Sequence, residues 1–381
     1  LDFVGDGLMS VSVPSEKLGI IKDINGNTLK SLISNSGLLK ANGGIIKLSA
    51  ATAKNLSRSS VNIGSSGLII ARSVNDKTGK VVIGSPTNEK IKIAGKIDVS
   101  GHRSLTPSGT IIVRGRSVTH NGKIFARGGT GGKVNIISKD TLKLDGSIFA
   151  QGTKEKGGSV LFLSEKSISS TPKTVVDVSG ANKGGRIRSL AKSTNTSSGT
   201  FKSNSKGGKG GNIDLTGDRV EISNAKIEAA GNLMGGKVRI GGDYLGGQDL
   251  TIMDNKNVYG FVSRFGDQPS IQNSKQTIVK ADTNIDVSSK KGQGGTAVVW
   301  SDQMTDFEGK INARGAEIAA LTTVVNTDKS TNKSSKEPPI LTIKTKLEPI
   351  ESTVDPPPKQ VIQLSRNQIK SQVDPPPPKI F

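Results

Sequence analysis

Apolar and polar residues alternate along this chain in short segments that glycine turns separate. In Lys133–Ile137 (KVNII), Lys237–Ile240 (KVRI) and Lys123–Ala126 (KIFA), apolar side chains largely take turns with polar ones. An alternation of period two gives a strand one inward and one outward face. Because this pattern runs from Leu32 to about Val325 with almost no helical periodicity, the sequence predicts an all-β body.

The strands recur as a degenerate repeat: a strand, a Gly turn, a second short strand, a GG corner and another strand. The clearest copies are Asn121–Ile136, Asp145–Phe162, Asn224–Ile240 and Thr283–Trp300. Repeats of this length are typical of a solenoid, in which each unit buries its apolar face only against its neighbours. We therefore expect the function to lie on a long lateral surface rather than in a pocket.

Glycines mark the length of one turn of the solenoid, which we call a coil. Consecutive first-strand glycines recur at nearly regular intervals that shorten slightly along the chain, at Gly37, Gly67, Gly95, Gly122 and Gly146. Each interval suits one three-sided parallel β-coil. GG pairs precede many of the short apolar strands, and we expect these corners to use the left-handed backbone conformation that glycine tolerates. The fold class predicted is a three-sided parallel β-helix.

Composition divides the chain into three regions. Residues 1–31 hold the strand-like segments Phe3–Val13 and Leu18–Ile24, which we expect either to cap the solenoid or to be the remnant of a preceding coil. Residues 32–325 form the β-helix. Residues 326–381 are polar and then proline-rich, so we expect a disordered tail that acts as a spacer. Because the chain opens without a Met and without a signal peptide, we expect it to be a piece of a longer precursor.

Two segments interrupt the repeat and are predicted to be insertion loops. Lys192–Gly211 is rich in Ser, Thr, Lys and Gly, and we expect it to be flexible. Asp249–Gln276 carries the large side chains Tyr259, Phe261 and Phe265 and is expected to pack over the edge of a coil. Loops on a rigid scaffold often carry function. We expect partner contacts in these two loops, and the pattern assigns no single binding residue.

The chain is strongly basic, with a net charge of +21 over 381 residues. Such a charge favours an acidic partner, such as nucleic acid, anionic polysaccharide or a lipid surface, or else a solvated surface whose lysines discourage edge-to-edge pairing of sheets. The basic residues are spread along the chain and are not clustered with aromatic residues. This favours the solvated surface, and we expect no specific nucleic acid partner. No apolar run is long enough to span a bilayer.

Residue types that support catalysis or metal binding are scarce. Cysteine is absent, which excludes disulfides, Cys-ligated metals and thiol catalysis. The two histidines, His102 and His120, are expected on the surface or in loops, and no HExxH, GxSxG or Walker motif is present. Gly207–Leu215 (GGKGGNIDL) is similar to a calcium-binding nonapeptide but has Asn212 at its Asp position. We therefore expect no metal ion, no cofactor and no catalytic residue.

Three aspartates recur in equivalent strands: Asp98 in IDVS, Asp177 in VDVS and Asp286 in IDVS. Clustered carboxylates on a parallel β-helix would serve a polysaccharide lyase or hydrolase. The separations of these aspartates along the sequence place them several coils apart, with Phe125 and Phe149 in the corresponding positions between them. We expect an outward polar column rather than an active site.

The longer motifs resemble those of the filamentous haemagglutinin family, which are large exoproteins secreted by the two-partner route. The similarity covers most of Phe3 to Gly315 and is carried by FVGDGLMSVSVP (Phe3–Pro14), LISNSGLLKANGGIIKLSAATAKNL (Leu32–Leu56), GGDYLGG (Gly241–Gly247) and GGTAVVWSDQMTDFEGKINARG (Gly294–Gly315). The resemblance implies a right-handed parallel β-helix, secreted or on the outer surface of a Gram-negative cell, exported through a dedicated outer-membrane pore. The family's secretion domain is missing, so we expect a fragment.

Family members act as adhesins, as haemagglutinins or as stalks for contact-dependent toxins. The leading hypothesis is a non-enzymatic, adhesin-like rod that contacts host or neighbouring cells, with basic residues attracting anionic glycans. One alternative is an inert stalk of a larger exoprotein, which includes a toxin carrier. Another is a polysaccharide lyase or hydrolase on the same fold, which would need a groove with at least two close carboxylates.

Overall fold

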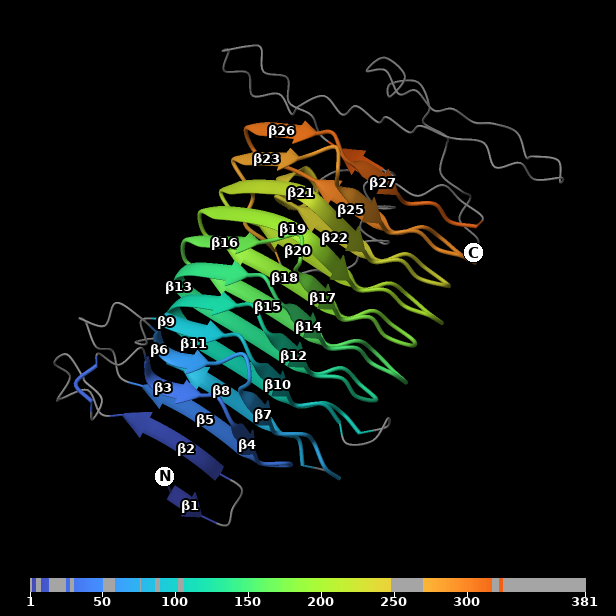
Figure 1. Cartoon of the computed structure of the whole chain (residues 1–381). Helices are drawn as coiled ribbons and strands as arrows, with labels where there is room; N and C mark the ends of the chain where they lie inside the picture. The colour runs from blue at the N-terminus through green and yellow to red at the C-terminus, as the bar shows by residue number, and fades with distance from the viewer. Residues whose placement is uncertain are drawn as a thin grey trace, which may run out of the picture. The chain divides into compact units, whose positions relative to one another are not determined.

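The repeat folds into a parallel β-solenoid in which each coil contributes one strand to each of three faces (Figure 1). The computed structural model describes residues 2–4, 8–13, 25–27, 31–50, 59–75, 77–85, 90–101, 106–247, 270–316 and 322–324. All of them lie in the first of the chain's two compact units, Leu1–Ile343. The prediction of an all-β, three-sided parallel β-helix is confirmed.

Each face is a column of strands, and we call the columns faces A, B and C. Face A consists of β2 (Leu8–Val13), β5 (Ile45–Ala50), β8 (Lys80–Gly84), the first part of β11 (Thr110–His120), the first part of β13 (Lys133–Leu144), β15 (Ser159–Ser164), β18 (Arg186–Ala191), β20 (Asn212–Thr216), β22 (Lys237–Ile240), β25 (Thr296–Val299) and β28 (Thr322–Val324). Face B consists of β3 (Ser31–Asn35), β6 (Ser59–Ile63), β9 (Lys90–Ile93), the last parts of β11 and β13, β16 (Ser167–Ser170), the first part of β19 (Thr194–Lys202), the first part of β21 (Arg219–Glu228), β23 (Gln276–Val279) and β26 (Met304–Phe307).

Face C holds the shortest strands and shows the register most clearly. It consists of β4 (Leu38–Lys40), β7 (Leu68–Ile70), β10 (Lys96–Asp98), β12 (Lys123–Phe125), β14 (Ser147–Phe149), β17 (Val175–Asp177), the ends of β19 and β21, β24 (Asn284–Asp286) and β27 (Lys310–Asn312). Its first paired positions come directly after the first-strand glycines and are Leu38, Leu68, Lys96, Lys123 and Ser147. The coil lengths predicted from the glycine spacing are therefore confirmed.

The core is a set of inward columns of branched aliphatic side chains. On face C one such column is at most 1% exposed and runs through Ile69, Ile97, Ile124, Ile148, Val176, Phe201, Ile227 and Ile285. Burial of one side chain of this size contributes about 1.5–3 kcal/mol. The alternation of period two in the sequence therefore becomes the division between this core and the outward columns.

The GG corners need glycine mainly because adjacent coils approach each other closely. A Cβ atom on Gly157 would lie 1.7 Å from the carbonyl oxygen of Val178, and one on Gly184 would lie 1.9 Å from that of Ser203. Neither glycine has a positive φ, whereas Gly43 does, at 69°. The left-handed conformation expected at the corners thus applies to Gly43 but is wrong for these two, where the backbone of the next coil excludes a side chain.

The prediction that Lys192–Gly211 is an insertion loop is wrong, because this segment is part of a regular coil. Its strand β19 pairs with β16 and β17 on one side and with β21 on the other. The inward Asn195 is fully buried, and its Nδ2 donates to the carbonyl oxygens of Ser189 (2.8 Å) and Thr216 (3.1 Å). A polar side chain whose hydrogen bonds are satisfied can take a core position, and the composition of the segment concealed that position.

The second predicted insertion falls in a coil that is longer than its neighbours. On face C, Lys226 pairs with Asn284, and Asn284 pairs in turn with Lys310. The coil from Lys226 to Asn284 is therefore more than twice as long as the coil that follows it. Its described parts include the 3₁₀ turn η1 (Tyr244–Gly247) and the residues from 270 to β23. The residues between, with Tyr259, Phe261 and Phe265, lie outside the described part.

At the N-terminal end, β2 continues face A by pairing in parallel with β5, and β1 (Asp2–Val4) pairs antiparallel with β2. The first two strands therefore lie at the end of a column, where a cap was expected. Leu18–Ile24, His102 and the predicted tail 326–381 lie outside the described residues.

His120 differs from its predicted position on the surface or in a loop. It is the last residue of β11, where its side chain points inward and is 1% exposed. Its neighbours in the column are Ile93 and Leu144. The alternation within the strand sets this orientation, because Val118 and His120 share the inward face.

Candidate functional site

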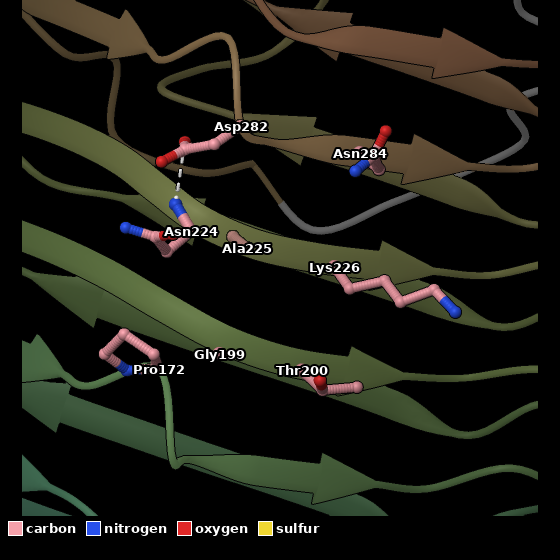
Figure 2. Close-up of a pocket in the computed structure, with 8 residues that line it drawn as sticks. All are labelled: Pro172, Gly199, Thr200, Asn224, Ala225, Lys226, Asp282 and Asn284. Carbon is pink, nitrogen blue, oxygen red and sulfur yellow. Dashed lines mark hydrogen bonds between the residues drawn. The ribbon is translucent and has the colours of Figure 1, made fainter.

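The described residues form shallow depressions rather than a deep cleft. One depression, of about 250 Å³, lies where face C meets the preceding corner (Figure 2) and is lined by Pro172, Gly199, Thr200, Asn224, Ala225, Lys226, Asp282 and Asn284. It contains no aromatic side chain, and it is smaller than the roughly 300–1,000 Å³ typical of a small-molecule site.

Charged groups in the lining of this depression already have partners in the fold. The backbone N–H of Asn224, a residue with φ of 47°, donates to Asp282 Oδ1 at 2.8 Å. Lys226 Nζ lies 2.5 Å from Glu228 Oε1, on the neighbouring part of face C. In Figure 2 the side chain of Lys226 extends along the strand direction, away from Asn224. The depression is therefore a weak candidate for a specific small-molecule site.

Face C carries an outward column with a mixed chemical character. In register, it runs through Asp98, Phe125, Phe149, Asp177, Lys202, Glu228, Asp286 and Asn312. The sequence prediction that Phe125 and Phe149 occupy the positions between Asp98 and Asp177 is confirmed. Three steps of about 4.8 Å separate these two aspartates, or about 14 Å, which exceeds the roughly 5–9.5 Å between the carboxylates of a glycosidase.

The predicted aspartates are held by neighbours one coil away or by the following backbone. Asp98 Oδ2 accepts a hydrogen bond from Arg72 Nη2 at 2.7 Å. Burial raises the pKa of Asp98, but hydrogen bonds from Arg72 and Ser100 outweigh it, so that the pKa lies below its ordinary value. Asp177 accepts from Gln151 Nε2 at 2.7 Å. The expected role as outward polar positions agrees with these contacts.

Two carboxylates do occupy adjacent positions of this column, namely Glu228 and Asp286. Sequence reasoning missed Glu228 because its strand ends in IEAAG rather than IDVS. An alignment of the repeat copies Asn224–Ile240 and Thr283–Trp300 on their second strands pairs the two residues. Within this column, as far as the described residues show it, Glu228 and Asp286 are the only carboxylates in adjacent positions.

The surroundings of Glu228 are unsuitable for a general acid. Its carboxylate lies 2.5 Å from Lys226 Nζ and 3.5 Å from Lys202 Nζ, and it accepts from Asn204 Nδ2 at 3.0 Å. Burial raises the pKa of Glu228, but the bonds from Lys226 and Asn204 outweigh it and lower the pKa. A glycosidase acid needs a raised pKa to hold its proton. Glu228 therefore remains ionised.

The aromatic positions of the column form a closed stack. The rings of Phe125 and Phe149 are 5.5 Å apart and nearly parallel, with an interplanar angle of 19°. The guanidinium of Arg127 lies 4.5 Å from the centre of the Phe149 ring, and Lys96 Nζ lies 4.8 Å from that of Phe125. Because the rings stack on each other and on cations, they contribute to cohesion between coils.

A buried ion cluster holds the base of the long insertion to face A. Arg239, on the outward side of β22, is only 1% exposed in its side chain, and its Nε and Nη1 contact Asp214 (2.8 Å) and Asp243 (2.6 Å). Asn273 Nδ2 donates to the carbonyl oxygen of Gly246 at 2.9 Å, which joins the two described ends of the insertion. Losing one partner of such a buried pair is strongly destabilising, so we assign this cluster a structural role.

Neither a metal centre nor a membrane-crossing helix emerges from the described residues. They contain no group of three or more His, Asp or Glu side chains arranged to hold a metal ion. Among them, no helix has the length and apolar character that crossing a bilayer requires.

A similarity to a known protein is found at the level of structure. No protein-family model matches the chain, and no curated protein sequence matches it. Among solved structures, the crystal structure of the HMW1 secretion domain from Haemophilus influenzae is similar, with a TM-score of 0.48 and 20% identity over 76% of this chain and 87% of that chain. This is a likeness between two chains, and it assigns no function to this one.

Proposed function

We propose that this chain is a non-enzymatic, adhesin-like β-solenoid that mediates contact with cells or glycans through its lateral surface. The observation that supports the proposal most is the continuity of the outward columns. Nine successive pairings carry face C from β4 to β27 through the described residues. A surface of repeated positions suits many weak contacts made at once, whose combined strength exceeds that of each.

The proposal also draws on the resemblance of the sequence motifs to the filamentous haemagglutinin family. In this proposal the chain is secreted or lies on the outer surface of a Gram-negative bacterium, and its precursor is exported by the two-partner route. The partner would be a host or neighbouring cell. The net charge of +21 supports attraction to anionic glycans on such a surface.

The non-enzymatic part of the proposal is supported by the state of the carboxylates. Glu228 and Asp286 are adjacent, but Glu228 is held ionised by two lysines. Incubation of the full chain with a polyuronate, followed by absorbance of unsaturated products and by a reducing-sugar assay, should show no turnover. Turnover that Glu228→Gln abolishes would favour the lyase or hydrolase alternative instead.

The adhesive part is tested by coating beads with the full chain and counting the cells bound. We expect saturable binding at low salt that free chain competes away. An inert stalk predicts no more binding than beads coated with an uncharged β-solenoid. If the beads bind neither cells nor immobilised glycans at low salt, the adhesin proposal is wrong.

A further inference from the structure

Three lysines stack on one another at the corner between faces C and A. Lys156, Lys183 and Lys209 occupy the same position of three successive coils, and parallel bridges join Lys156 to Lys183 and Lys183 to Lys209. All three residues are exposed. Because adjacent strands lie about 4.8 Å apart, the backbone repeats one lysine at about that interval. We call these three residues the lysine row.

The fold itself does not require lysine at this position. What the position supplies is a backbone carbonyl oxygen, which accepts a hydrogen bond of 2.9–3.0 Å from a corner glycine in the preceding coil. The same bond recurs in five coils, from Gly131 to Lys156, Gly157 to Lys183, Gly184 to Lys209, Gly210 to Met234 and Gly235 to Gln293. Met234 and Gln293 thus fill the role equally well, whereas stacked like charges oppose folding.

The surroundings of the lysine row are basic and offer little neutralisation. The five corner turns 153–156, 181–183, 206–209, 232–234 and 290–293 hold one acidic residue, Glu155, against seven lysines: Lys154, Lys156, Lys183, Lys206, Lys209, Lys290 and Lys291. Glu155 accepts a hydrogen bond from the Thr130 hydroxyl. Within the described residues, none of the ion pairs includes a lysine of the row.

The positive charges of the row also affect the pKa of a neighbouring lysine. Lys237, at the start of β22, has a pKa lowered to about 8 by burial and by the charges of Lys183 and Lys209. On face C, by contrast, Lys202 and Lys226 share the carboxylate of Glu228. The row therefore differs from the solvated and paired lysines elsewhere on the solenoid, because its charges reinforce one another.

We propose that the lysine row binds a linear anionic polysaccharide that lies along the solenoid axis, a site that rests on the adhesin-like function proposed above. A polymer with regularly repeated sulfate or carboxylate groups can meet successive lysines at once, which multiplies weak contacts. The five corner turns contain no aromatic residue. Single-stranded nucleic acid sites normally add aromatic platforms for the bases, so the polysaccharide is favoured.

The test uses the full chain and heparin as a sulfated polysaccharide probe, with affinity measured at several salt concentrations. The variant replaces the row: Lys156→Ser, Lys183→Ser and Lys209→Ser. The matched control removes the same charge from exposed outward positions away from this corner, two on face B and one on face C: Lys92→Ser, Lys143→Ser and Lys123→Ser. Circular dichroism confirms that both variants fold.

We expect the row variant to bind heparin about tenfold or more weakly at low salt. The slope of log affinity against log salt is negative, and its magnitude should decrease by about 2. This figure takes, for each of the three lysines, the roughly 0.7 counterions released per contact on a single-stranded nucleic acid. The control should change affinity by less than about twofold. Conversely, Met234→Lys with Gln293→Lys should extend the row by two positions and strengthen binding several-fold.

Equal losses in the row variant and the control would overturn this inference, because net charge alone would then explain binding. Tighter binding of duplex DNA than of heparin at the same salt would overturn the choice of polysaccharide. The cell-binding assay keeps the two proposals separate. If the row variant keeps its heparin affinity while the unmodified chain binds cells, the lysine row is not the binding site and the adhesin proposal stands. If heparin binding needs the row but the unmodified chain binds no cells, the row binds the polysaccharide and the adhesin proposal is wrong.

Discussion

His120 should make the stability of the solenoid depend on pH between about 4 and 6.5. Its ring is buried between Ile93 and Leu144 of the adjacent coils. Neither ring nitrogen makes a hydrogen bond of good geometry among the described residues, and the backbone of Ser147 offers only a weak one. Burial disfavours the charged imidazolium and lowers the pKa of His120 to about 4. The unfolded chain, with an ordinary pKa of about 6.5, therefore takes up a proton that the folded chain does not.

The sign and size of the effect follow from these two pKa values. Above about pH 6.5, His120 is neutral in both the folded and the unfolded chain, so the free energy of unfolding has its full value. It decreases as the pH falls toward 4, because only the unfolded chain takes up the proton. A shift of about 2.5 units at about 1.36 kcal/mol per unit amounts to about 3.4 kcal/mol, of which about 2.5 kcal/mol is lost by pH 4.5. His120→Leu should remove this dependence. It should also stabilise the chain at pH 7.5 by about 1–3 kcal/mol, because an apolar side chain replaces a buried polar ring that is poorly hydrogen-bonded.

The assay is denaturant unfolding of the full chain at pH 7.5, 5.5 and 4.5, followed by far-ultraviolet circular dichroism. Leu144→Ala, in the same column, serves as the control: it should lower the free energy of unfolding by about 2–5 kcal/mol and keep the pH dependence of the unmodified chain. The reasoning would be refuted if the unmodified chain and His120→Leu lost equal stability between pH 7.5 and 4.5.

Two further substitutions test the account of the corners and the core. Gly184→Ala should lower the midpoint of thermal unfolding and cost about 1–3 kcal/mol of stability, because its Cβ would lie 1.9 Å from the carbonyl oxygen of Ser203. Gly37→Ala should cost much less, because no atom lies within 4 Å of its Cβ. Equal losses in the two variants would contradict the close-approach argument. Val134→Asp should cost several kcal/mol in denaturant unfolding, because it buries an unpaired charge between Ile111 and Val160; a loss below about 1 kcal/mol would show that this column is not packed as described.

Sequence reasoning reached the parts of the fold that repeat with a fixed period. Glycine spacing predicted the coil length, and the equivalence of the IDVS strands placed Phe125 and Phe149 in the same column as Asp98. These inferences succeed because in a solenoid each position has one neighbour above and one below, so that an offset along the chain becomes a distance along the axis.

Reasoning from composition failed where a local environment overrides the residue type. Lys192–Gly211 has the composition of a loop, yet Asn195 satisfies its hydrogen bonds inside the core and Phe201 fills the inward column. His120 is polar, but the alternation within β11 directs it inward. Strand alternation identifies the inward position of His120, whereas Asn195 stands in a wholly polar run that gives no such signal.

An alignment of the repeat copies could have found both the lysine row and the pair Glu228–Asp286. Lys156, Lys183 and Lys209 each stand directly before a GG corner in the sequence, and the bridges between them confirm that they share a position. The backbone bond to a corner glycine defines the common position. Both features therefore follow from aligning the repeat copies on their glycine corners and second strands.

The account is tested most directly by the binding of bead-coated full chain to cells across a salt series, with the row variant and its charge-matched control in the same experiment. The account predicts saturable binding at low salt that falls steeply with salt, weakens in the row variant and persists in the control. Binding no greater than that of an uncharged β-solenoid at every salt concentration would contradict it.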